Sequence, residues 1–415
     1  MHVSRFKNHL IIFKVNASPL HIDLIGIGNK TNSELSSEYR LLIQKHRLFS
    51  GGKRHYDLVK HLLPKQHEWI DIAGKMPDLM NKYMEADQKR IVVFASGDPL
   101  FFGFANTVKR LLPQASICVY PYFNALQLLA HKAVLNYSNL CTISLHGRNT
   151  WKPLDKCLIN GEERIGILTD NTHSPRHIAE RLRLYNFLDY ELLIGEELEG
   201  KNEKIRQLSI EETLLINDFQ KLNCVILIKK SERKVPLSFS DSSFQTLEGR
   251  PGMITKQAIR SITIPSLELH NKKCFWDIGS CTGAIAIETQ LSYPSLNVFA
   301  FEIRQECDQI IANNTYTHQC PGIHIEINDF MKLDLDEFQK PDAIFIGGHG
   351  NRLAEMMGKI DYVLDKGGIV VMNTILEKSF NTFIKCATDL NYQLLPPLKI
   401  SLNEHNTVHV LVAKK

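Results

Sequence analysis

Short apolar runs alternate with longer amphipathic stretches along almost the whole chain, in two successive series. This alternation is typical of strand–helix units stacked into mainly parallel sheets. The first series starts at residue 21 and predicts strands at HIDLIGIG, RIVVFAS, SICVYP, LCTISLHG, RIGILTD, YELLIGEEL and NCVILIKK. The second predicts them at KCFWDIG, NVFAFEI, GIHIEIND, PDAIFIGG and GGIVVMN, with a closing hairpin around YQLLPPLKI and NTVHVLVAK. The pattern predicts an α/β protein whose second half is one doubly wound sheet.

The length of the chain, 415 residues, suits two domains better than one hydrophobic core. A polar segment rich in Ser, Gly and Pro, SERKVPLSFSDSSFQTLEGRPG, separates the two series and is typical of an interdomain linker. We therefore predict an N-terminal extension over 1–20, a first domain over 21–232, a linker over 233–249 and a second domain over 250–415.

Composition narrows the choice of partners. No apolar run approaches the roughly 20 residues needed to cross a bilayer, and the formal charge of +4 forms no basic run that would follow a phosphate backbone. The nine cysteines are scattered without a Cys-x-x-Cys pair, so we predict no metal site. We expect a cytoplasmic protein that binds neither membranes nor nucleic acid.

The most informative segment is FWDIGSCTGAIAIETQ, in which an apolar strand passes through Gly279 to Gly283 into a helix. Glycines at such a turn let the backbone approach a ligand closely. The next strand ends at Glu302, at the spacing at which an acid reaches a ribose hydroxyl in nucleotide-binding folds. The Gly-x-x-x-Gly spacing favours S-adenosylmethionine over a dinucleotide. The alternative is a tight strand-to-helix turn that binds nothing.

Further candidates lie at other strand ends of the second half. Gly347 and Gly348 end one predicted strand and Asn373 ends another, at the carboxyl edge where open α/β sheets bind ligands. Thr255, Lys256 and Arg260 precede the glycine-rich strand at the spacing of one helical face. For these three, a solvated helix edge is the simpler interpretation.

TKQAIR, DIGSCTGAIAIE, FEI, FIGGHG and the strand followed by Asn-x-x-x-Glu resemble the precorrin methyltransferase-decarboxylase domains of cobalamin biosynthesis, over residues 250–415. The resemblance implies a Rossmann-like methyltransferase. It implies that S-adenosylmethionine is bound by Thr255, Gly279, Ser280, Cys281, Thr282, Gly283 and Glu302. Phe330 departs from the family, which usually carries a small residue beside the adenine. We take Gly347, Gly348 and Asn373 as candidate catalytic residues, with His349 beside them as a substrate contact.

The first half contains LIGIG, SGGKRHYD, ASGDPLFFG, VYPYFNALQLLA, SLHGR and LTDNTHSP in an order that resembles the tetrapyrrole methylase superfamily, over residues 21–230. The resemblance implies two α/β lobes with S-adenosylmethionine between them, bound by Gly97, Asp98, Leu100, Leu168 and Thr169. Two segments depart from the family, NKTNSELS after LIGIG and Phe123-Asn124 where Ser-Ser is expected. Guanidinium groups match carboxylates well. The candidate contacts to an acidic macrocycle are Arg54, His55, His146, Arg148, Lys256, Arg260 and His349.

Together the two resemblances imply one S-adenosylmethionine per domain and a precorrin substrate. The first domain would methylate carbon 5, and the second would methylate carbon 15 and remove the carbon-12 acetate carboxyl. They also imply a homo-oligomer. Two other functions stay open: methylation of another small molecule or of RNA, and binding of S-adenosylmethionine without catalysis.

Overall fold

The computed structural model describes residues 20–30, 35–231, 236–401 and 406–415. The predicted extension over 1–20 therefore lies outside the described residues except for Leu20. The chain divides into two compact units. The first contains the described residues up to Tyr137 together with Gly195–Ile205 and Gln220–Asn223. The second contains Ser138–Ile194, Arg206–Phe219 and the described residues between Cys224 and Lys415. Within the described part of the chain, no helix has the length and apolarity needed to span a membrane.

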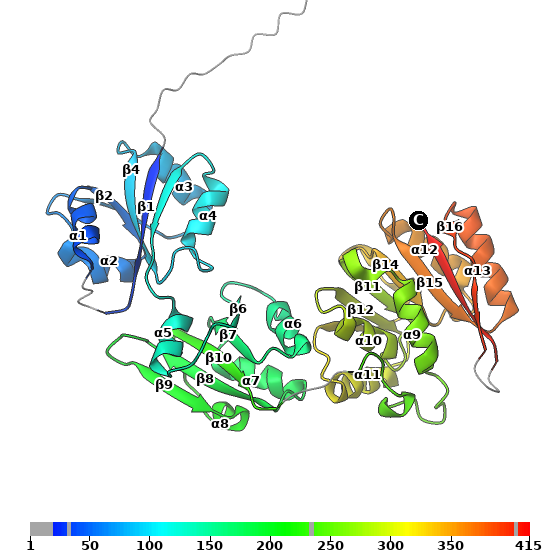
Figure 1. Cartoon of the computed structure of the whole chain (residues 1–415). Helices are drawn as coiled ribbons and strands as arrows, with labels where there is room; N and C mark the ends of the chain where they lie inside the picture. The colour runs from blue at the N-terminus through cyan, green and yellow to red at the C-terminus, as the bar shows by residue number, and fades with distance from the viewer. Residues whose placement is uncertain (1–19, 31–34, 232–235, 402–405) are drawn as a thin grey trace, which may run out of the picture. The chain divides into compact units, whose positions relative to one another are not determined.

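The first sheet has the order β3-β2-β4-β1-β5, and each neighbouring pair is parallel. Its elements and the helix that follows are β1 His21–Ile27, α1 Ser37–Gln44, β2 Leu48–Gly51, α2 Lys53–Val59, the 3-10 turn η1 Lys60–Leu62, β3 Glu68–Asp71, α3 Met76–Glu85, β4 Arg90–Ser96, α4 Phe104–Leu111, β5 Ser116–Tyr120 and α5 Ala125–Lys132. Helices α3 and α4 cover one face and α1 and α2 the other (Figure 1). This double cover explains why the central strands β1 and β4 are apolar on both faces.

The second sheet has the order β6-β7-β10-β8-β9 and is mixed, since β6 and β7 are parallel whereas β7 and β10 are antiparallel. Its elements are β6 Cys141–Ser144, α6 Lys152–Asn160, β7 Arg164–Leu168, α7 Pro175–Leu184, β8 Tyr190–Glu196, β9 Lys204–Leu208, α8 Ile210–Leu214 and β10 Asn223–Lys229. Its core joins apolar strand residues to α6, α7 and α8. The sequence predicts a single series of strands here, and the structure distributes that series over two sheets.

The third sheet has the order β13-β12-β11-β14-β15-β18-β16, with β17 paired to β18. Its elements are η2 Asp241–Ser243, α9 Gln257–Ser266, η3 Leu269–Asn271, β11 Cys274–Ile278, α10 Ala284–Ser292, β12 Asn297–Glu302, α11 Glu306–Thr317, β13 Ile323–Ile327, η4 Phe330–Lys332, η5 Leu335–Glu337, β14 Ala343–Ile346, α12 Leu353–Val363, β15 Ile369–Thr374, α13 Glu377–Asp389, β16 Gln393–Leu394, β17 Leu398–Ile400 and β18 Val408–Lys414. Strands β11 to β15 are parallel, and β18 closes the sheet antiparallel to β15. The α/β class and the doubly wound second half are confirmed.

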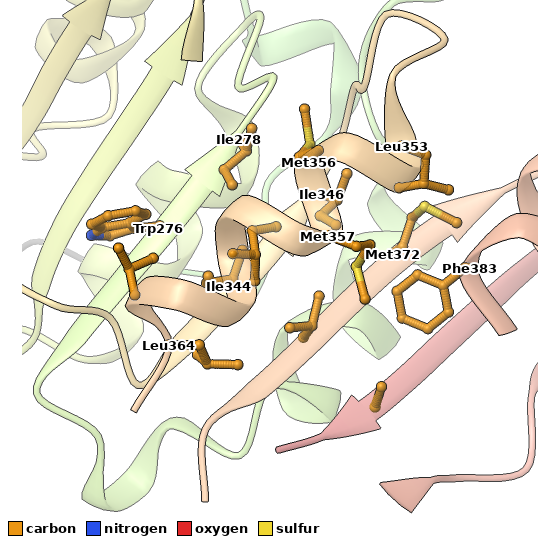
Figure 2. Packing of buried hydrophobic residues seen from close by; sticks show 14 of the residues in the cluster. Trp276, Ile278, Ile344, Ile346, Leu353, Met356, Met357, Leu364, Met372 and Phe383 are labelled. Atoms are coloured by element: carbon orange, nitrogen blue, oxygen red, sulfur yellow. The ribbon is translucent and has the colours of Figure 1, made fainter. Parts of the chain in front are cut away.

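Helices cover both faces of the third sheet. On one face, the α12 side chains Met356 and Met357 pack against Ile346 and Met372 of the strands, with Phe383 of α13 beside them (Figure 2). On the other face, α9 and α10 cover alternate residues of the same strands. The buried methionines and aromatic rings fix the strands, and so they fix the loops at the carboxyl ends of those strands.

The predicted linker is corrected by the structure. Residues 236–249 pack onto the third sheet and its helices: Phe244 and Leu247 are buried there. The amide of Gln245 donates a 2.7 Å hydrogen bond to Asn314. The segment is polar because its hydroxyls bond to the fold, as where Ser238 donates to the Glu288 carboxylate. Its composition alone does not distinguish such a packed strap from a linker.

Candidate functional site

A cavity of about 520 Å³ lies at the carboxyl ends of β11 to β15. The strand order reverses between β11 and β14, and such a reversal is where open α/β sheets bind ligands. The volume falls within the range of about 300 to 1,000 Å³ that is usual for small-molecule sites. The predicted residues that line the cavity are Thr255, Lys256, Gly279, Ser280, Cys281, Thr282, Glu302, Phe330, Gly347, Gly348, His349 and Asn373.

The glycine-rich turn after β11 is held against the loop after β14. Gly279 has a φ of +77°, and a Cβ added to it would lie 2.5 Å from the amide nitrogen of Gly348. Any other residue would therefore combine a strained φ with a steric clash. Cys281 also has a positive φ of 52°, although it carries a side chain. The turn thus presents its backbone to the cavity in a conformation that Gly279 makes possible.

Two buried carboxylates face this turn, and they differ in how far they are satisfied. Glu302 accepts backbone N–H bonds from Cys281, Ile303 and Arg304 at 2.9 to 3.0 Å, and a further bond from the Arg304 side chain. In Asp277, Oδ2 accepts bonds from the Ser280 hydroxyl and the Ala286 amide, whereas Oδ1 is buried and has no partner among the described residues.

Burial makes ionised Asp277 costly. Loss of solvation, with a smaller contribution from the charge of Glu302, raises the pKa of Asp277 to about 7 against the hydrogen bonds from Ser280 and Ala286. Because Asp277 lines the cavity and its carboxylate is poorly compensated, the site is suited to a ligand that brings a positive charge.

The loop after β14 and the end of β15 contribute uncharged groups to the cavity, beside the ion pair of Arg352 with Asp329. The amides of Gly347 and Gly348 both donate to the carbonyl of Ile278, at 2.8 and 3.2 Å, so they are already engaged within the fold. His349 contacts Ser379 at 3.2 Å, and burial lowers its pKa. The side-chain amide of Asn373 donates to the hydroxyl of Thr263 at 2.8 Å, and that hydroxyl donates to the carbonyl of Ile259 at 2.8 Å.

The structure corrects two predicted contacts. Arg260 is fully buried, and its guanidinium donates to Glu288 at 2.8 Å and to Asp241 at 2.7 Å. It therefore joins the packed strap to α10 and does not reach the cavity. Helix α9 begins at Gln257, so Thr255 and Lys256 lie before it rather than on a shared helical face with Arg260. Gly283 does not line the cavity. It is the N-cap residue of α10 and has a φ of +74°.

In the first unit, Gly97, Asp98 and Leu100 form a tight turn after β4. Gly97 has a φ of +63°, and a Cβ added to Gly26 would lie 2.0 Å from its carbonyl oxygen, so β1 and this turn are in close contact. Asp98 accepts the Leu100 amide at 2.8 Å. Asn124, which departs from the family pattern, caps α5 through reciprocal hydrogen bonds with Gln127.

Arg54 and His55 lie in the first turn of α2, and both contact the hydroxyl of Ser96, at 2.6 and 2.9 Å. Sequence reasoning passed over Ser96, since a serine at a strand end is common. It also left out Asp277, although an acid that ends an apolar strand is the signal that could have identified it.

The other predicted residues follow strands of the second sheet. Leu168 ends β7, and its carbonyl accepts the amide of Leu145 at 2.9 Å. His146 contacts the carbonyl of Thr169 through Nδ1 at 3.1 Å, which requires a proton on that nitrogen and leaves Nε2 as an acceptor. His146 and Arg148 are exposed.

A doubly wound sheet with a glycine turn after its first strand and buried acids near the ends of its first two strands is the arrangement with which open α/β sheets bind nucleotide-like ligands. A family model for the precorrin methyltransferase domain matches residues 248–408. Over 136 residues the chain is 31% identical to the cobalt-precorrin-6B C(15)-methyltransferase (decarboxylating) of Salmonella typhimurium, which covers 33% of this chain and 69% of that protein. The chain therefore belongs to the precorrin methyltransferase family.

Relatives also match the first half. The precorrin-6Y C(5,15)-methyltransferase [decarboxylating] of a Sinorhizobium species is 29% identical over 361 residues, 85% of this chain and 84% of that protein. The cobalt-precorrin-7 C(5)-methyltransferase of Salmonella typhimurium is 26% identical over 211 residues, 50% of this chain and 98% of that protein. The predicted resemblance of the chain to fused precorrin methyltransferases is confirmed.

Proposed function

We propose that the chain is a bifunctional, S-adenosylmethionine-dependent precorrin methyltransferase of cobalamin biosynthesis. Residues 21–232 would methylate carbon 5, and the domain that ends at residue 415 would methylate carbon 15 and remove the carbon-12 acetate carboxyl. The observation that carries the proposal is the cavity at the switch point of the third sheet, with the bare oxygen of Asp277 buried at its wall.

The residues of this cavity fit S-adenosylmethionine, which carries positive charge and ribose hydroxyls. The buried carboxylate of Asp277 would act on the positive charge through the wall of the cavity. Glu302 accepts several bonds on Oε1 but only the Cys281 amide on Oε2, so one acceptor position remains for a ribose hydroxyl. Because Gly279 has no side chain, a ligand can come close to the backbone of this turn. When bound, S-adenosylmethionine supplies a methyl group on a cationic sulfur that a nucleophilic carbon can take directly.

The chain need supply no strong base for methylation, because the nitrogens of a reduced tetrapyrrole make its bridging carbons nucleophilic. Its task is to align that carbon and exclude water. The rim formed by Gly347, Gly348, His349 and Asn373 would face the substrate. For loss of the acetate carboxyl this rim is favourable, because the glycine amides are engaged with Ile278 and burial favours neutral His349. A substrate carboxylate bound at this rim is little stabilised by the protein. Little stabilisation is therefore lost when that carboxylate leaves as carbon dioxide.

For the first domain we propose a second S-adenosylmethionine site, within the two-lobed architecture of the tetrapyrrole methylases. Gly97, Asp98 and Leu100 would contribute from the turn after β4. The resemblance to the tetrapyrrole methylases also implies a contribution from Leu168 and Thr169, at and after the end of β7. The tight Asp98 turn and the close approach of Gly26 to Gly97 support a backbone-lined site. His146 and Arg148 would contact substrate carboxylates. Assembly into a homo-oligomer is part of the proposal and is checked by light scattering.

The experiment is calorimetric titration of the intact chain with S-adenosylmethionine, followed by turnover of a precorrin analysed by mass spectrometry. We expect two binding sites and the gain of two methyl groups with loss of carbon dioxide. A single site, or the gain of a single methyl group, contradicts the tandem proposal. Parallel assays with cobalt-loaded and metal-free precorrin identify which form is the substrate.

A further inference from the structure

Three side chains of the first unit meet at the carboxyl end of β4. The hydroxyl oxygen of Ser96 lies 2.6 Å from Nη2 of Arg54 and 2.9 Å from Nε2 of His55. Nη1 of Arg54 donates to the side-chain oxygen of Asn29 at 2.8 Å. Ser96 is exposed and directly precedes Gly97. The cluster therefore lies beside the turn that we assign to the first domain's site.

The hydrogen-bond pattern fixes the direction of each proton. The amide of Gly52 donates to Nδ1 of His55 at 3.2 Å, so the proton of the neutral ring is on Nε2 and is donated to Ser96. Burial, together with the charge of Arg54, lowers the pKa of His55 to about 4, which keeps the ring neutral. The 3.4 Å contact between His55 and Arg54 then joins two donors and is not a hydrogen bond.

The hydroxyl of Ser96 can consequently still donate one hydrogen bond. A hydroxyl oxygen accepts two hydrogen bonds and donates one. Arg54 and His55 occupy both acceptor positions, so the O–H hydrogen must point away from them, on the exposed side of Ser96. Both donors also polarise this hydroxyl, which makes it a better donor to a ligand.

The charge of Arg54 has no counter-ion among the described residues. Its contacts are the amide oxygen of Asn29 and the hydroxyl of Ser96, both neutral, and no carboxylate of the described part of the chain lies within ion-pair distance. Burial lowers the pKa of Arg54, which is the direction expected for a cation deprived of water without an anion beside it. A bound anion would offset this cost.

We propose that Arg54, His55 and Ser96 form a binding site for one carboxylate of a ligand of the first domain. The Ser96 hydroxyl donates directly to the carboxylate, Arg54 supplies the positive charge, and His55 is a positioning residue that restricts the hydroxyl to one direction. The inference rests on the proposed function, which offers two sources of the carboxylate: an acid side chain of the tetrapyrrole and the amino-acid end of S-adenosylmethionine.

The test uses the full chain with Ser96→Ala, and Ser116→Ala as the matched control. Ser116 is also exposed, belongs to the same sheet and contacts a histidine ring, but it lies at the amino end of β5. Ser96→Thr keeps the hydroxyl and tests rescue. Loss of one hydrogen bond to a charged group corresponds to a loss of affinity of about tenfold or more.

If the tetrapyrrole supplies the carboxylate, Ser96→Ala raises the KM for precorrin in carbon-5 methylation at least about tenfold with little change in kcat. If the donor supplies it, calorimetry shows one of two S-adenosylmethionine sites weakened to that extent. Ser96→Thr stays near wild type in both cases. His55→Phe raises the same constant by less, again without lowering kcat, because the hydroxyl remains but is no longer restricted.

Equal behaviour of Ser96→Ala and Ser116→Ala in both assays overturns the carboxylate site. Binding of coproporphyrin III, a stable tetrapyrrole with propionate groups, separates this outcome from failure of the proposed function. A chain that turns over no precorrin, yet binds this porphyrin in a Ser96-dependent way, rejects the proposed reaction and retains the site. Circular dichroism of each variant verifies folding before the constants are compared.

Discussion

Replacing Gly279 by alanine tests the construction of the second site. The new Cβ would lie 2.5 Å from the nitrogen and 2.7 Å from the Cα of Gly348, on a residue with a φ of +77°. A left-handed backbone costs an alanine about 1 to 2 kcal/mol. Overpacking against backbone that cannot rotate away costs about 1 to 3 kcal/mol more. We therefore expect Gly279→Ala to lower the free energy of unfolding of this domain by about 2 to 5 kcal/mol.

Two matched glycines separate the contributions. Gly367 has a φ of +75° but no atom within 4 Å of the added Cβ, so Gly367→Ala measures the backbone cost alone, about 1 to 2 kcal/mol. Gly358 is exposed inside α12 and also has nothing within 4 Å, so Gly358→Ala stabilises the helix by about 0.5 to 1 kcal/mol. The difference between Gly279→Ala and Gly367→Ala is the steric cost.

Urea unfolding is followed by the fluorescence of Trp276, which is fully buried in the third sheet. Replacing Trp69 and Trp151 by phenylalanine leaves it the sole reporter among the three tryptophans. Calorimetry and product analysis accompany unfolding. We expect Gly279→Ala to weaken one S-adenosylmethionine site and to impair carbon-15 methylation and decarboxylation, while carbon-5 methylation persists. A variant no less stable than Gly367→Ala, with intact carbon-15 methylation, would refute the close contact of the two loops.

Two other predictions follow from buried charges of the same domain. Because the folded-state pKa of Asp277, about 7, lies above its ordinary value of 3.8, the folded state binds the extra proton. The free energy of unfolding therefore falls by at most about 4 kcal/mol as pH rises from about 4 to 7. The affinity for cationic S-adenosylmethionine rises over the upper part of the same pH range, because Asp277 becomes ionised there. Asp277→Asn flattens both profiles, and unchanged profiles in that variant would contradict the assignment. Arg260→Ala leaves Glu288 buried without its cation, so we expect the free energy of unfolding in the urea assay to fall by about 3 to 5 kcal/mol. A fall below about 1 kcal/mol would show that Arg260 contributes only as much as a surface ion pair does.

Long apolar strands were predictable from the sequence, whereas polar edge strands and the short buried strand β2 were not. The runs that became β1, β4 and β11 are buried along nearly their whole length, so their composition alone identifies them. By contrast β3 has the pattern EWID with both ends exposed, and β9 reads KIRQL at the edge of its sheet. An edge strand needs no continuous apolar run, because one side of it has no neighbouring strand.

In the candidate site, too, local sequence patterns were predictable, whereas contacts between residues distant in the sequence were not. Gly279 and Glu302 were found because a turn and a strand end are local patterns. The burial of Arg260 depends on Asp241 and Glu288, which lie far from it in the sequence and meet it only in the fold. Spacing along one helix indicated a surface residue, although tertiary contacts surround its side chain. Pairing between distant charges is the information that a single sequence does not contain.

The two sites differ more in which polar groups lack a hydrogen-bond partner than in their sequence motifs. Both lie after a parallel strand, yet β4 ends in a hydroxyl that can only donate and is backed by the cation of Arg54. Strand β11 instead ends near a bare carboxylate oxygen of Asp277, with Glu302 as a second acid nearby. The first arrangement is stabilised by an anion and the second by a cation, because each ligand offsets a desolvated charge of the opposite sign. Ligand charge can therefore be inferred from which partner is missing, whereas the glycine turns beside both sites indicate only that a ligand can come close.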